Sequence, residues 1–431
     1  MRIEPAAALV GAAGVPGNKG SSQRAVLLGA VADGESRIRG FGRAADTQSA
    51  IDAARTLGAE VIDNGDDDLR VLGVGLHGLR SATIDCGNAG TVLRLLCGLL
   101  VGQRGEAFEL VGDESLTMRP HERAAAPLRK MGAAIETTEG HAPVRIEGRD
   151  LQPISYELPV ASAQVKSAIL LAGLFAQSGP TTVVEPHPTR DHTERMLASA
   201  GVPLRRTVRS VSVWPVERLP PLDLDIPGDI SSAAPLVTAA VLLNGSELIL
   251  QNVNVNPLRT GLLDVLERMG ARVAVFNRRT VGGEPVADLE VRSTQLVATT
   301  VEAEEVPRLV DELPLVALLG AFARGTTIVR GAEELRAKET DRIETVVDSL
   351  RAIGVRIEAR PDGFVVRGTP ARPRGGRIDA RGDHRIAMLG GVAGLVSREG
   401  VELEDAECVA VSFPGFFDLL AELAQRSGEF G

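Results

Sequence analysis

Residues 34–41 read GESRIRGF, a glycine followed by a short run that is typical of a β-strand. The same arrangement, in which a glycine ends a helix of small residues and a strand follows, recurs six times along the chain. The other copies begin near Gly105, Gly179, Gly245, Gly325 and Gly400, so that neighbouring copies lie 66 to 80 residues apart. A second helix ends at another glycine in five copies, at Gly58, Gly132, Gly201, Gly270 and Gly354. Self-similarity of this kind indicates one supersecondary unit used repeatedly.

Each copy predicts the order strand, helix, strand, helix, strand, strand. The first helices are rich in Ala, Leu and Gly nearly all round, which is typical of helices in the centre of a domain. They are expected at Ser21–Ala32, Thr91–Val101, Gln164–Ala176, Ser231–Leu243, Glu312–Ala323 and His384–Val396. The second helices carry polar faces and should lie nearer the surface, as at Thr47–Leu57, Glu122–Met131 and Arg342–Ile353. The pattern predicts a mixed α/β (α+β) protein.

A chain of 431 residues is longer than one hydrophobic core usually fills, so two domains are expected. Units of about seventy residues favour a closed arrangement of three repeats per domain over a solenoid. The breaks Pro16-Gly17 and Pro227-Gly228 separate an inserted domain, residues 15–228, from a composite domain of residues 1–14 and 229–431. The two chain crossings would form a hinge, and the active site is expected in the cleft between the domains.

The composition excludes several classes of protein. The net charge is 47 − 57 = −10 and aromatic residues make up only 3%, which argues against a general binder of nucleic acid or of an anionic membrane. Three cysteines form no CxxC pair and suit a reducing compartment. The apolar start Ala6–Val15 is too short to span a membrane and has no basic region before it, so we expect a cytoplasmic protein. We expect neither a metal nor an organic cofactor.

The starts of the six central helices contain most of the candidate functional residues. A helix N-terminus offers unpaired N–H groups and a partial positive charge, and therefore binds phosphate or carboxylate. If the six starts converge, these side chains would point at one place: Lys19, Asn88, Ser162, Gln164, Asp311, His384 and Arg385. The alternative is that the acidic and polar members only cap their helices. Asp229, Asp311 and Asp383 stand at similar positions in three copies, and Ser162 or Asn88 could also be caps.

Three arginines stand where a helix N-terminus would prefer an acid, namely Arg119, Arg190 and Arg342. Their repetition suggests that each meets an anion. Together with Lys19, Arg24, Lys338 and Arg385 they could clamp several anionic groups, because arginine suits carboxylate and phosphate. Asp311 and Glu339 lie among these bases and could exchange protons. The set fits chemistry on a phosphorylated and carboxylated substrate.

Several longer motifs resemble one known family over essentially the whole chain and in the right order. They are PGNKGSSQRAVLL, GNAGTVLRLL, SAQVKSAILLAGL, LRAKETDR, RGDHRIAM and SFPGFF. The chain is thereby similar to the 5-enolpyruvylshikimate-3-phosphate synthase (3-phosphoshikimate 1-carboxyvinyltransferase) family of enolpyruvyl transferases. The resemblance implies two inverse α/β barrel domains, built from six βαβαββ repeats with three in each domain. It also implies a monomer.

The resemblance implies transfer of the enolpyruvyl group of phosphoenolpyruvate to the 5-hydroxyl of shikimate 3-phosphate, with release of phosphate, in aromatic amino-acid biosynthesis. The implied phosphoenolpyruvate-binding residues are Lys19, Asn88, Gly90, Arg119, Gln164, Arg342 and Arg385. The implied residues for shikimate 3-phosphate are Lys19, Gly20, Arg24, Ser162, Ala163, Gln164, Arg190, Asp311 and Lys338. Asp311 would take the hydroxyl proton, Glu339 would move protons at the methylene carbon, and Lys19 and His384 would assist.

Four positions depart from the family pattern. Gly20 stands where the family usually has Ser, and Val411 replaces a lysine that many members use for phosphoenolpyruvate. His121-Glu122 follows Arg-Pro where smaller or apolar residues are commoner, and Asn18 precedes Lys19 where one subclass has Asp. We expect an active enzyme with weakened binding of shikimate 3-phosphate. Gly90 leaves room for the inhibitor glyphosate, while other segments resemble a tolerant subclass, so we expect intermediate sensitivity.

Two alternatives remain. A UDP-N-acetylglucosamine enolpyruvyl transferase has the same architecture, but it would carry a catalytic cysteine near Gly112–His121, where this chain has none. A catalytically impaired paralogue that binds the same anionic ligands would explain Gly20 and Val411, although Asp311 and Glu339 are both present.

Overall fold

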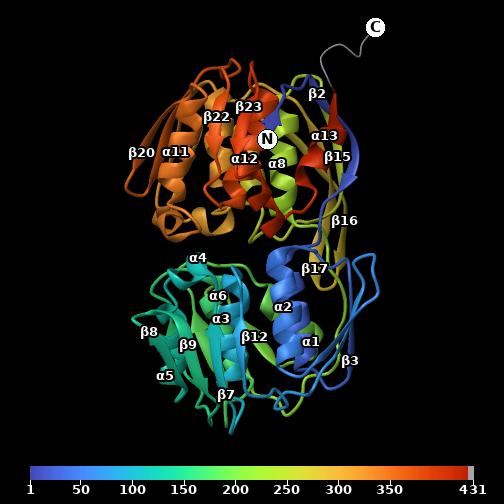
Figure 1. Cartoon of the computed structure of the whole chain (residues 1–431), viewed down its shortest axis with the longest axis vertical. Helices are drawn as coiled ribbons and strands as arrows, with labels where there is room; N and C mark the ends of the chain where they lie inside the picture. The colour runs from blue at the N-terminus through green and yellow to red at the C-terminus, as the bar shows by residue number, and fades with distance from the viewer. Residues whose placement is uncertain (426–431) are drawn as a thin grey trace. The chain divides into compact units, whose positions relative to one another are not determined.

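The computed structural model describes residues 1–425 and has a mixed α/β fold (Figure 1). Its internal contacts divide the chain into two compact units. The composite unit consists of Met1–Pro16, Gly228–Arg279 and the chain from Pro285 onward. The inserted unit consists of Gly17–Pro227 together with the short segment Thr280–Glu284. Each unit has a hydrophobic core of its own.

Three four-stranded sheets form the inserted unit, with the orders β14-β3-β5-β4, β6-β7-β9-β8 and β10-β11-β13-β12. In each sheet the first pair is parallel and the next two pairs are antiparallel. The strands are β3 Glu35–Arg39, β4 Glu60–Asp63, β5 Leu69–Leu72, β6 Ala82–Asp85, β7 Ala107–Val111, β8 Ala134–Thr138, β9 His141–Glu147, β10 Ser155–Glu157, β11 Thr181–Val184, β12 Leu204–Arg206, β13 Ser210–Val213 and β14 Asp223–Asp225. The helices are α1 Lys19–Ala30, α2 Ala45–Thr56, α3 Gly90–Leu100, α4 Glu114–Thr117, α5 Glu122–Lys130, α6 Ala163–Gly173 and α7 His192–Ser199.

The composite unit also contains three sheets, with the orders β1-β23-β22, β16-β17-β15-β2-β24 and β18-β19-β21-β20. The strands are β1 Arg2–Ile3, β2 Ala8–Gly14, β15 Glu247–Asn254, β16 Arg272–Val281, β17 Glu284–Arg292, β18 Thr300–Val301, β19 Gly325–Val329, β20 Arg356–Arg360, β21 Gly363–Gly368, β22 Gly376–Asp379, β23 Val401–Glu404 and β24 Ala424–Gln425. The helices are α8 Ile230–Leu242, α9 Gly261–Arg268, α10 Leu313–Phe322, α11 Arg342–Ala352, α12 His384–Val396 and α13 Phe416–Leu423, with short 3-10 turns at Val306–Arg308, Glu333–Ala337 and Ala406–Val411.

The parallel pairs follow from the order of the elements, because parallel strands need a crossover that is usually a helix. Helix α3 lies between β6 and β7, and α12 lies between β22 and β23. Two parallel pairs join distant parts of the chain instead. Strand β14 pairs with β3. Strand β15 pairs with β2, although the whole inserted unit separates these two strands in the sequence.

Six helices form the centres of the two units, as their composition predicts. Helices α8, α10 and α12 contact one another in the composite unit, and α8 and α12 can be followed side by side in Figure 1. Helix α3 contacts α1 and α6 in the inserted unit. Gly98 of α3 allows the close approach to α6, because a Cβ atom there would stand 2.3 Å from the carbonyl oxygen of Ala168. The predicted positions of these six helices are confirmed to within a few residues.

The glycines that end the helices have the expected backbone. All eleven, Gly34, Gly58, Gly105, Gly132, Gly179, Gly201, Gly245, Gly270, Gly325, Gly354 and Gly400, have positive φ angles between 70° and 130°. Glycine adopts this region without the steric penalty that a Cβ atom imposes. The repeated glycine therefore marks the turn from each helix into the next strand.

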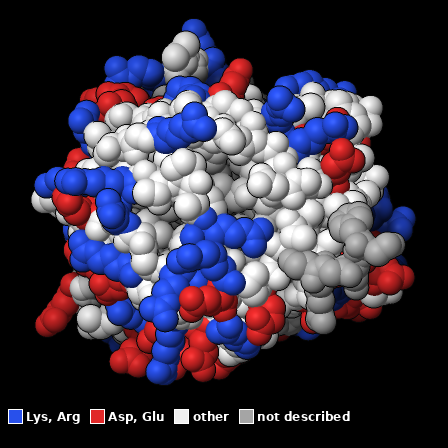
Figure 2. Space-filling model, turned by 90° about the horizontal axis from the view of Figure 1, so that it is seen from above, with Lys and Arg blue, Asp and Glu red and all other residues white. Residues whose placement is uncertain are grey.

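The surface shown in Figure 2 carries basic and acidic side chains interspersed around an area without charged residues. No single sign of charge covers this face. Among the described residues, none of the helices is both long and apolar enough to cross a membrane.

Candidate active site

The start of α1 places Lys19, Gly20 and Arg24 beside one another. Lys19 forms an ion pair with Asp46, with 2.7 Å between Nζ and Oδ2. Arg24 donates from Nη1 to the carbonyl oxygen of Gly20 at 2.9 Å, and it is only 5% exposed. Lys19 thus has an acidic partner within the chain.

Two further contacts tie Arg24 to the helices that follow. Its Nε donates to Thr193 Oγ1 at 2.7 Å, and its Nη2 donates to Ser167 Oγ at 3.3 Å. Ser167 belongs to α6 and Thr193 to α7. The guanidinium is therefore fixed by three elements.

A second group of the inserted unit forms around the start of α3. Arg119 donates from Nη2 to Asn88 Oδ1 at 2.6 Å and to Ser115 Oγ at 3.1 Å. Asn88 in turn donates to Asp113 at 2.8 Å. A Cβ atom on Gly90 would stand 3.5 Å from Nη1 of Arg119, so this glycine lies directly beside the guanidinium.

Gln164 joins this group through Arg94. Its Nε2 donates to Thr91 Oγ1 at 2.8 Å, and its Oε1 accepts from Arg94 Nη1. A Cβ atom on Gly90 would be 3.3 Å from the same Nη1 of Arg94. The structure thus brings Asn88, Gly90, Arg119 and Gln164 into one connected set, with Arg94 between them.

The remaining predicted residues of the inserted unit lie at the starts of α6 and α7. Ser162 is the N-cap of α6, where its side chain accepts from the amide of Val165 at 3.4 Å, and Ala163 is the first helical residue. Arg190 is half-buried in the loop just before α7. The capping alternative is therefore confirmed for Ser162.

In the composite unit the guanidinium of Arg342 contacts three carboxylates. It donates from Nε to Asp383 Oδ2 at 2.7 Å, contacts Glu339 through Nη2, and lies 3.5 Å from Asp311 Oδ1 through Nη1. The residue is 1% exposed. Burial opposes its charge, but Asp383, Glu339 and Asp311 outweigh burial and hold the pKa of Arg342 above its ordinary value. Three carboxylates of the chain thus pair with this arginine.

The two predicted catalytic carboxylates, Asp311 and Glu339, consequently lie on one guanidinium. Asp383 is the N-cap of α12 and accepts from the amide of Arg385 at 2.9 Å. Asp229 likewise caps α8 through Ser231. Capping is confirmed for these two aspartates and wrong for Asp311, because the N-cap of α10 is Glu312 and Asp311 lies before it. Asn88 is not a cap either, since α3 has Ala89 at that position.

Three other predicted residues lie in the same unit. Lys338 pairs with Glu334 at 3.2 Å, four residues before it. His384 begins α12 and is 3% exposed. Arg385 donates from Nη1 to the carbonyl oxygen of Ser231 at 3.1 Å, which connects the starts of α12 and α8.

The prediction from sequence missed several charged residues that the structure places in these clusters. Arg94 sits inside the leucine-rich run of α3, where it is 5% exposed. Arg259 and Glu312 are also buried, at 6% and 2% exposure, and both stand close to Asp311. A charged residue within an apolar helix is a detectable signal for Arg94, since buried charges are almost always paired. Arg259 has no such signal in its local sequence.

Two departures from the family pattern have structural explanations. Asn18 caps α1 by accepting from the amide of Ser21 at 2.8 Å. His121 is 1% exposed and donates from Nε2 to the carbonyl oxygen of Leu116 at 3.0 Å. Burial, followed by the charge of Arg94, lowers the pKa of His121 to about 4, so this imidazole is neutral near pH 7. A third departure, Val411, is the last residue of a 3-10 turn.

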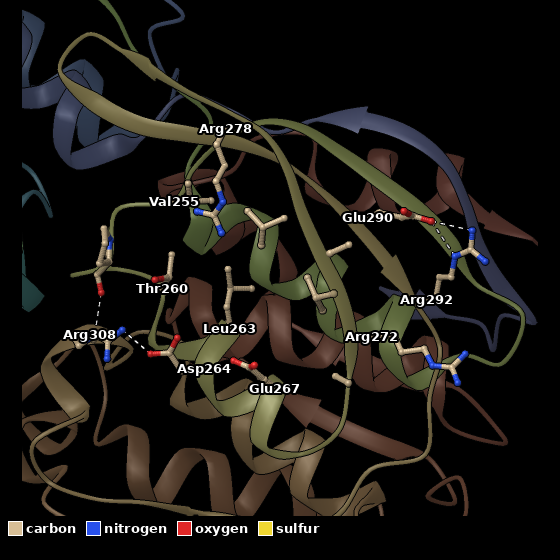
Figure 3. Close-up of a pocket in the computed structure, with 15 residues that line it drawn as sticks. Val255, Thr260, Leu263, Asp264, Glu267, Arg272, Arg278, Glu290, Arg292 and Arg308 are labelled. Carbon is tan, nitrogen blue, oxygen red and sulfur yellow. Dashed lines mark hydrogen bonds and ion pairs between the residues drawn. The ribbon is translucent and has the colours of Figure 1, made fainter.

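A separate groove of about 830 Å³ lies in the composite unit between α9 and the strands β16 and β17 (Figure 3). Leu263 and Thr260 point into it from α9 and the turn before it, and Arg278 points in from β16. Arg308 borders it and pairs with Asp264 at 2.5 Å. Its lining includes none of the predicted site residues, so the groove is distinct from the clusters above.

The arrangement supports two kinds of chemistry. The inserted unit presents Lys19, Arg24, Arg94 and Arg119, which suit phosphate and carboxylate groups. The composite unit presents Asp311 and Glu339 on a buried arginine, which suits proton transfer. Within residues 1–425 no group of three or more His, Cys, Asp or Glu side chains is arranged to hold a metal ion.

Comparison with known proteins identifies the family. A sequence profile of EPSP synthase (3-phosphoshikimate 1-carboxyvinyltransferase) matches residues 3–420. The chain is 48% identical to 3-phosphoshikimate 1-carboxyvinyltransferase of Alkalilimnicola ehrlichii, covering 98% of this chain and 95% of the relative. It is 47% identical to the enzyme of that name from Geobacter sulfurreducens, with 99% of each covered.

Solved structures agree with this result. EPSP synthase from Acinetobacter baumannii matches with a TM-score of 0.87 and 39% identity, over 99% of this chain and 98% of that one. The enolpyruvyl transferase NikO from Streptomyces tendae matches with a TM-score of 0.78 over 98% and 96% of the two chains, and at 20% identity this likeness shows the fold alone. The profile match, the close relatives and the shared fold together show that this chain belongs to the EPSP synthase (3-phosphoshikimate 1-carboxyvinyltransferase) family.

Proposed function

We propose that the chain transfers the enolpyruvyl group of phosphoenolpyruvate to the 5-hydroxyl of shikimate 3-phosphate and releases phosphate, as a step of aromatic amino-acid biosynthesis. Relatives across nearly the whole chain carry the name of this enzyme. The structural observation that carries the proposal is the pair Asp311 and Glu339 on the buried Arg342. A transfer of this kind needs proton acceptors and donors held at fixed positions.

The finer architecture is part of the proposal. We infer that each unit is an inverse α/β barrel of three repeats, six in all. Three sheets in each unit and the contacts among α8, α10 and α12 support this arrangement. We expect a cytoplasmic location from the sequence and a monomer from the family resemblance.

We infer that cationic side chains bind the two substrates. Lys19, Arg119, Arg342 and Arg385 would hold phosphoenolpyruvate, with the neighbouring residues Asn88, Gly90 and Gln164. The start of α3 has no side-chain cap, so its amides can receive an anionic oxygen. Shikimate 3-phosphate would contact Lys19, Gly20, Arg24, Ser162, Ala163, Gln164, Arg190 and Lys338. Both substrates are anionic, so cations must offset their repulsion before they can react.

The chemical steps follow from the carboxylates. Asp311 takes the proton of the 5-hydroxyl as that oxygen bonds to C2 of phosphoenolpyruvate, while Glu339 gives a proton to C3. The addition yields a tetrahedral intermediate in which C3 is a methyl group. Removal of one methyl proton to Glu339 and departure of phosphate from C2 then restore the double bond. Lys19 and His384 would assist these proton movements.

The alternatives have less support. A catalytic cysteine must ionise, whereas burial raises the pKa of Cys408 to about 12 and raises that of Cys86 and Cys97 as well. This disfavours the UDP-N-acetylglucosamine enolpyruvyl transferase. An impaired paralogue would be expected to lose the carboxylate pair, which this chain retains.

The test is phosphate release from phosphoenolpyruvate with and without shikimate 3-phosphate. We expect release only when both are present, and a loss of at least a hundredfold in kcat for Asp311→Ala, since general acid–base catalysis contributes about 10²–10⁴-fold. Asp348→Ala, which removes a surface partner of Arg381, is the matched control and should keep full activity. Release that does not need shikimate 3-phosphate would overturn the proposal.

A further inference from the structure

We propose that Arg259 is a positioning residue for Asp311, and that Ser231 and Glu312 hold the Arg259 guanidinium in place. The inference rests on the proposed function, because it concerns the group that accepts the hydroxyl proton. None of these three residues is among the site residues that the sequence predicts.

Arg259 lies between the carboxylates of Asp229 and Asp311. Its Nη2 donates to Asp229 Oδ1 at 3.1 Å, and its Nη1 lies 3.7 Å from Asp311 Oδ2. Asp311 meets Arg342 through its other oxygen at 3.5 Å. The two oxygens of Asp311 therefore face two different guanidinium groups, and the two ion pairs favour one orientation of the carboxylate.

Ser231 connects the parts of this arrangement. Its hydroxyl accepts from Arg259 Nη2 at 2.6 Å and donates to Glu312 Oε1. Its carbonyl oxygen accepts from Arg385 at 3.1 Å. One residue at the start of α8 thus links Arg259 with Glu312, which follows Asp311 in the chain, and with Arg385, a proposed ligand of phosphoenolpyruvate.

The burial of these groups makes the arrangement specific. Ser231, Arg259 and Glu312 are 1%, 6% and 2% exposed. A buried charge is costly unless it is paired and hydrogen-bonded, so Arg259 cannot change its partners freely. Burial, together with the nearby charge of Asp311, raises the pKa of Glu312. Loss of Arg259 would leave the carboxylates here without one of their cations.

The charged groups around Asp311 come from several elements. Arg259 approaches from the loop after β15, and Arg342 from the start of α11. Four carboxylates act on Asp311 directly or through these arginines, namely Glu312, Asp229, Glu339 and Asp383. Arg385 acts on Glu312 and donates to the carbonyl oxygen of Ser231. Removing the cation of Arg259 from this set favours protonation of Asp311, because an opposite charge within about 4–6 Å favours the ionised form.

The test compares Arg259→Gln with Arg259→Lys in steady-state kinetics across pH. We expect Arg259→Gln to lower kcat at least tenfold and to move the acidic limb of the kcat profile upward by about one pH unit. KM for both substrates should change less than threefold. Arg259→Lys keeps the positive charge but loses the planar guanidinium group. Its acidic limb should lie at the wild-type position, while its kcat should recover only in part. Ser231→Ala should shift the limb in the same direction by less.

The controls separate positioning from folding and from the proposed function itself. Arg268→Gln, on α9 in the same unit, removes a surface pair with Glu305 and should leave the profile unchanged. A wild type without turnover would refute the proposed function and this inference with it. If the wild type turns over and Arg259→Gln keeps the wild-type acidic limb, only the inference is refuted. This holds even where the melting temperature of Arg259→Gln falls. If Arg259→Gln does not fold, an unmoved limb in Ser231→Ala together with an undiminished kcat in Arg259→Lys overturns the inference.

Discussion

Arg342 shows how one residue can organise the reacting groups. Its guanidinium is buried and contacts Asp311, Glu339 and Asp383, which come from three separate segments of the chain. Removing one partner from such a cluster leaves an uncompensated buried charge, and the effect is about 3–5 kcal/mol. The same contacts bring the two proposed proton-transfer groups together, so stability and chemistry depend on the same side chain.

Gly20 is the residue whose substitution should improve the protein. A Cβ atom there would stand 3.2 Å from Nη1 of Arg24 and 3.6 Å from Oδ1 of Asn18, so a serine requires the hydrogen-bonded Arg24 guanidinium to move by a few tenths of an ångström. A hydrogen bond to a charged group is worth about 1.5–3 kcal/mol. We therefore expect Gly20→Ser to lower KM for shikimate 3-phosphate about ten- to a hundredfold, with KM for phosphoenolpyruvate unchanged.

Initial rates over a range of shikimate 3-phosphate concentrations check this expectation. Gly14→Ser is a suitable control, because a Cβ atom at Gly14 meets nothing within 4 Å. An unchanged KM in Gly20→Ser would mean that the substrate phosphate does not approach the start of α1.

At the scale of the elements, the segment from α4 to α5 should make stability depend on pH. His121 precedes α5, and burial holds its pKa at about 4, below the value of about 6.5 expected in the unfolded chain. The unfolded state therefore binds more protons between these two values. Stability from this group is full above about pH 6.5 and is lost as the pH falls toward 4, by about 3 kcal/mol.

Urea unfolding of the wild type and of His121→Gln at several pH values measures this contribution. The glutamine can donate to the carbonyl oxygen of Leu116 without binding a proton in this range. We expect the difference in unfolding free energy between the two proteins to change in favour of the variant as the pH falls from 6.5 to 4. Parallel curves for the two proteins would show that His121 does not titrate in this way.

The elements themselves were largely predictable, because their signals are local. Runs of small residues such as ISSAAPLVTAAVL gave the central helices, and the glycine after each run has the positive φ angle that ends it. The roles of helix starts were predicted less well. Asp229, Asp311 and Asp383 stand at similar sequence positions, yet Asp311 alone is not a cap, since Glu312 occupies the cap position of α10.

At the scale of the whole molecule, contacts between distant segments were not predictable. Arg259 follows β15, and its partners Asp229 and Asp311 lie 30 residues before it and well after it in the chain. No pattern within a short window of sequence reveals such a meeting, because the fold brings the segments together. The residues predicted for the site stand in recognisable motifs, and Arg94 also has a local signal as a charge within an apolar helix, whereas Arg259 required the structure.

Enolpyruvyl transfer is likewise a property of the whole chain. The most direct measurement uses phosphoenolpyruvate that carries ¹⁸O in the oxygen between carbon and phosphorus, together with shikimate 3-phosphate. Mass spectrometry then locates the label. Departure of phosphate from C2 breaks the carbon–oxygen bond, so we expect the label in the released phosphate and a new enolpyruvyl ether of shikimate 3-phosphate. Label in pyruvate, with shikimate 3-phosphate unconsumed, would show hydrolysis at phosphorus and contradict the account.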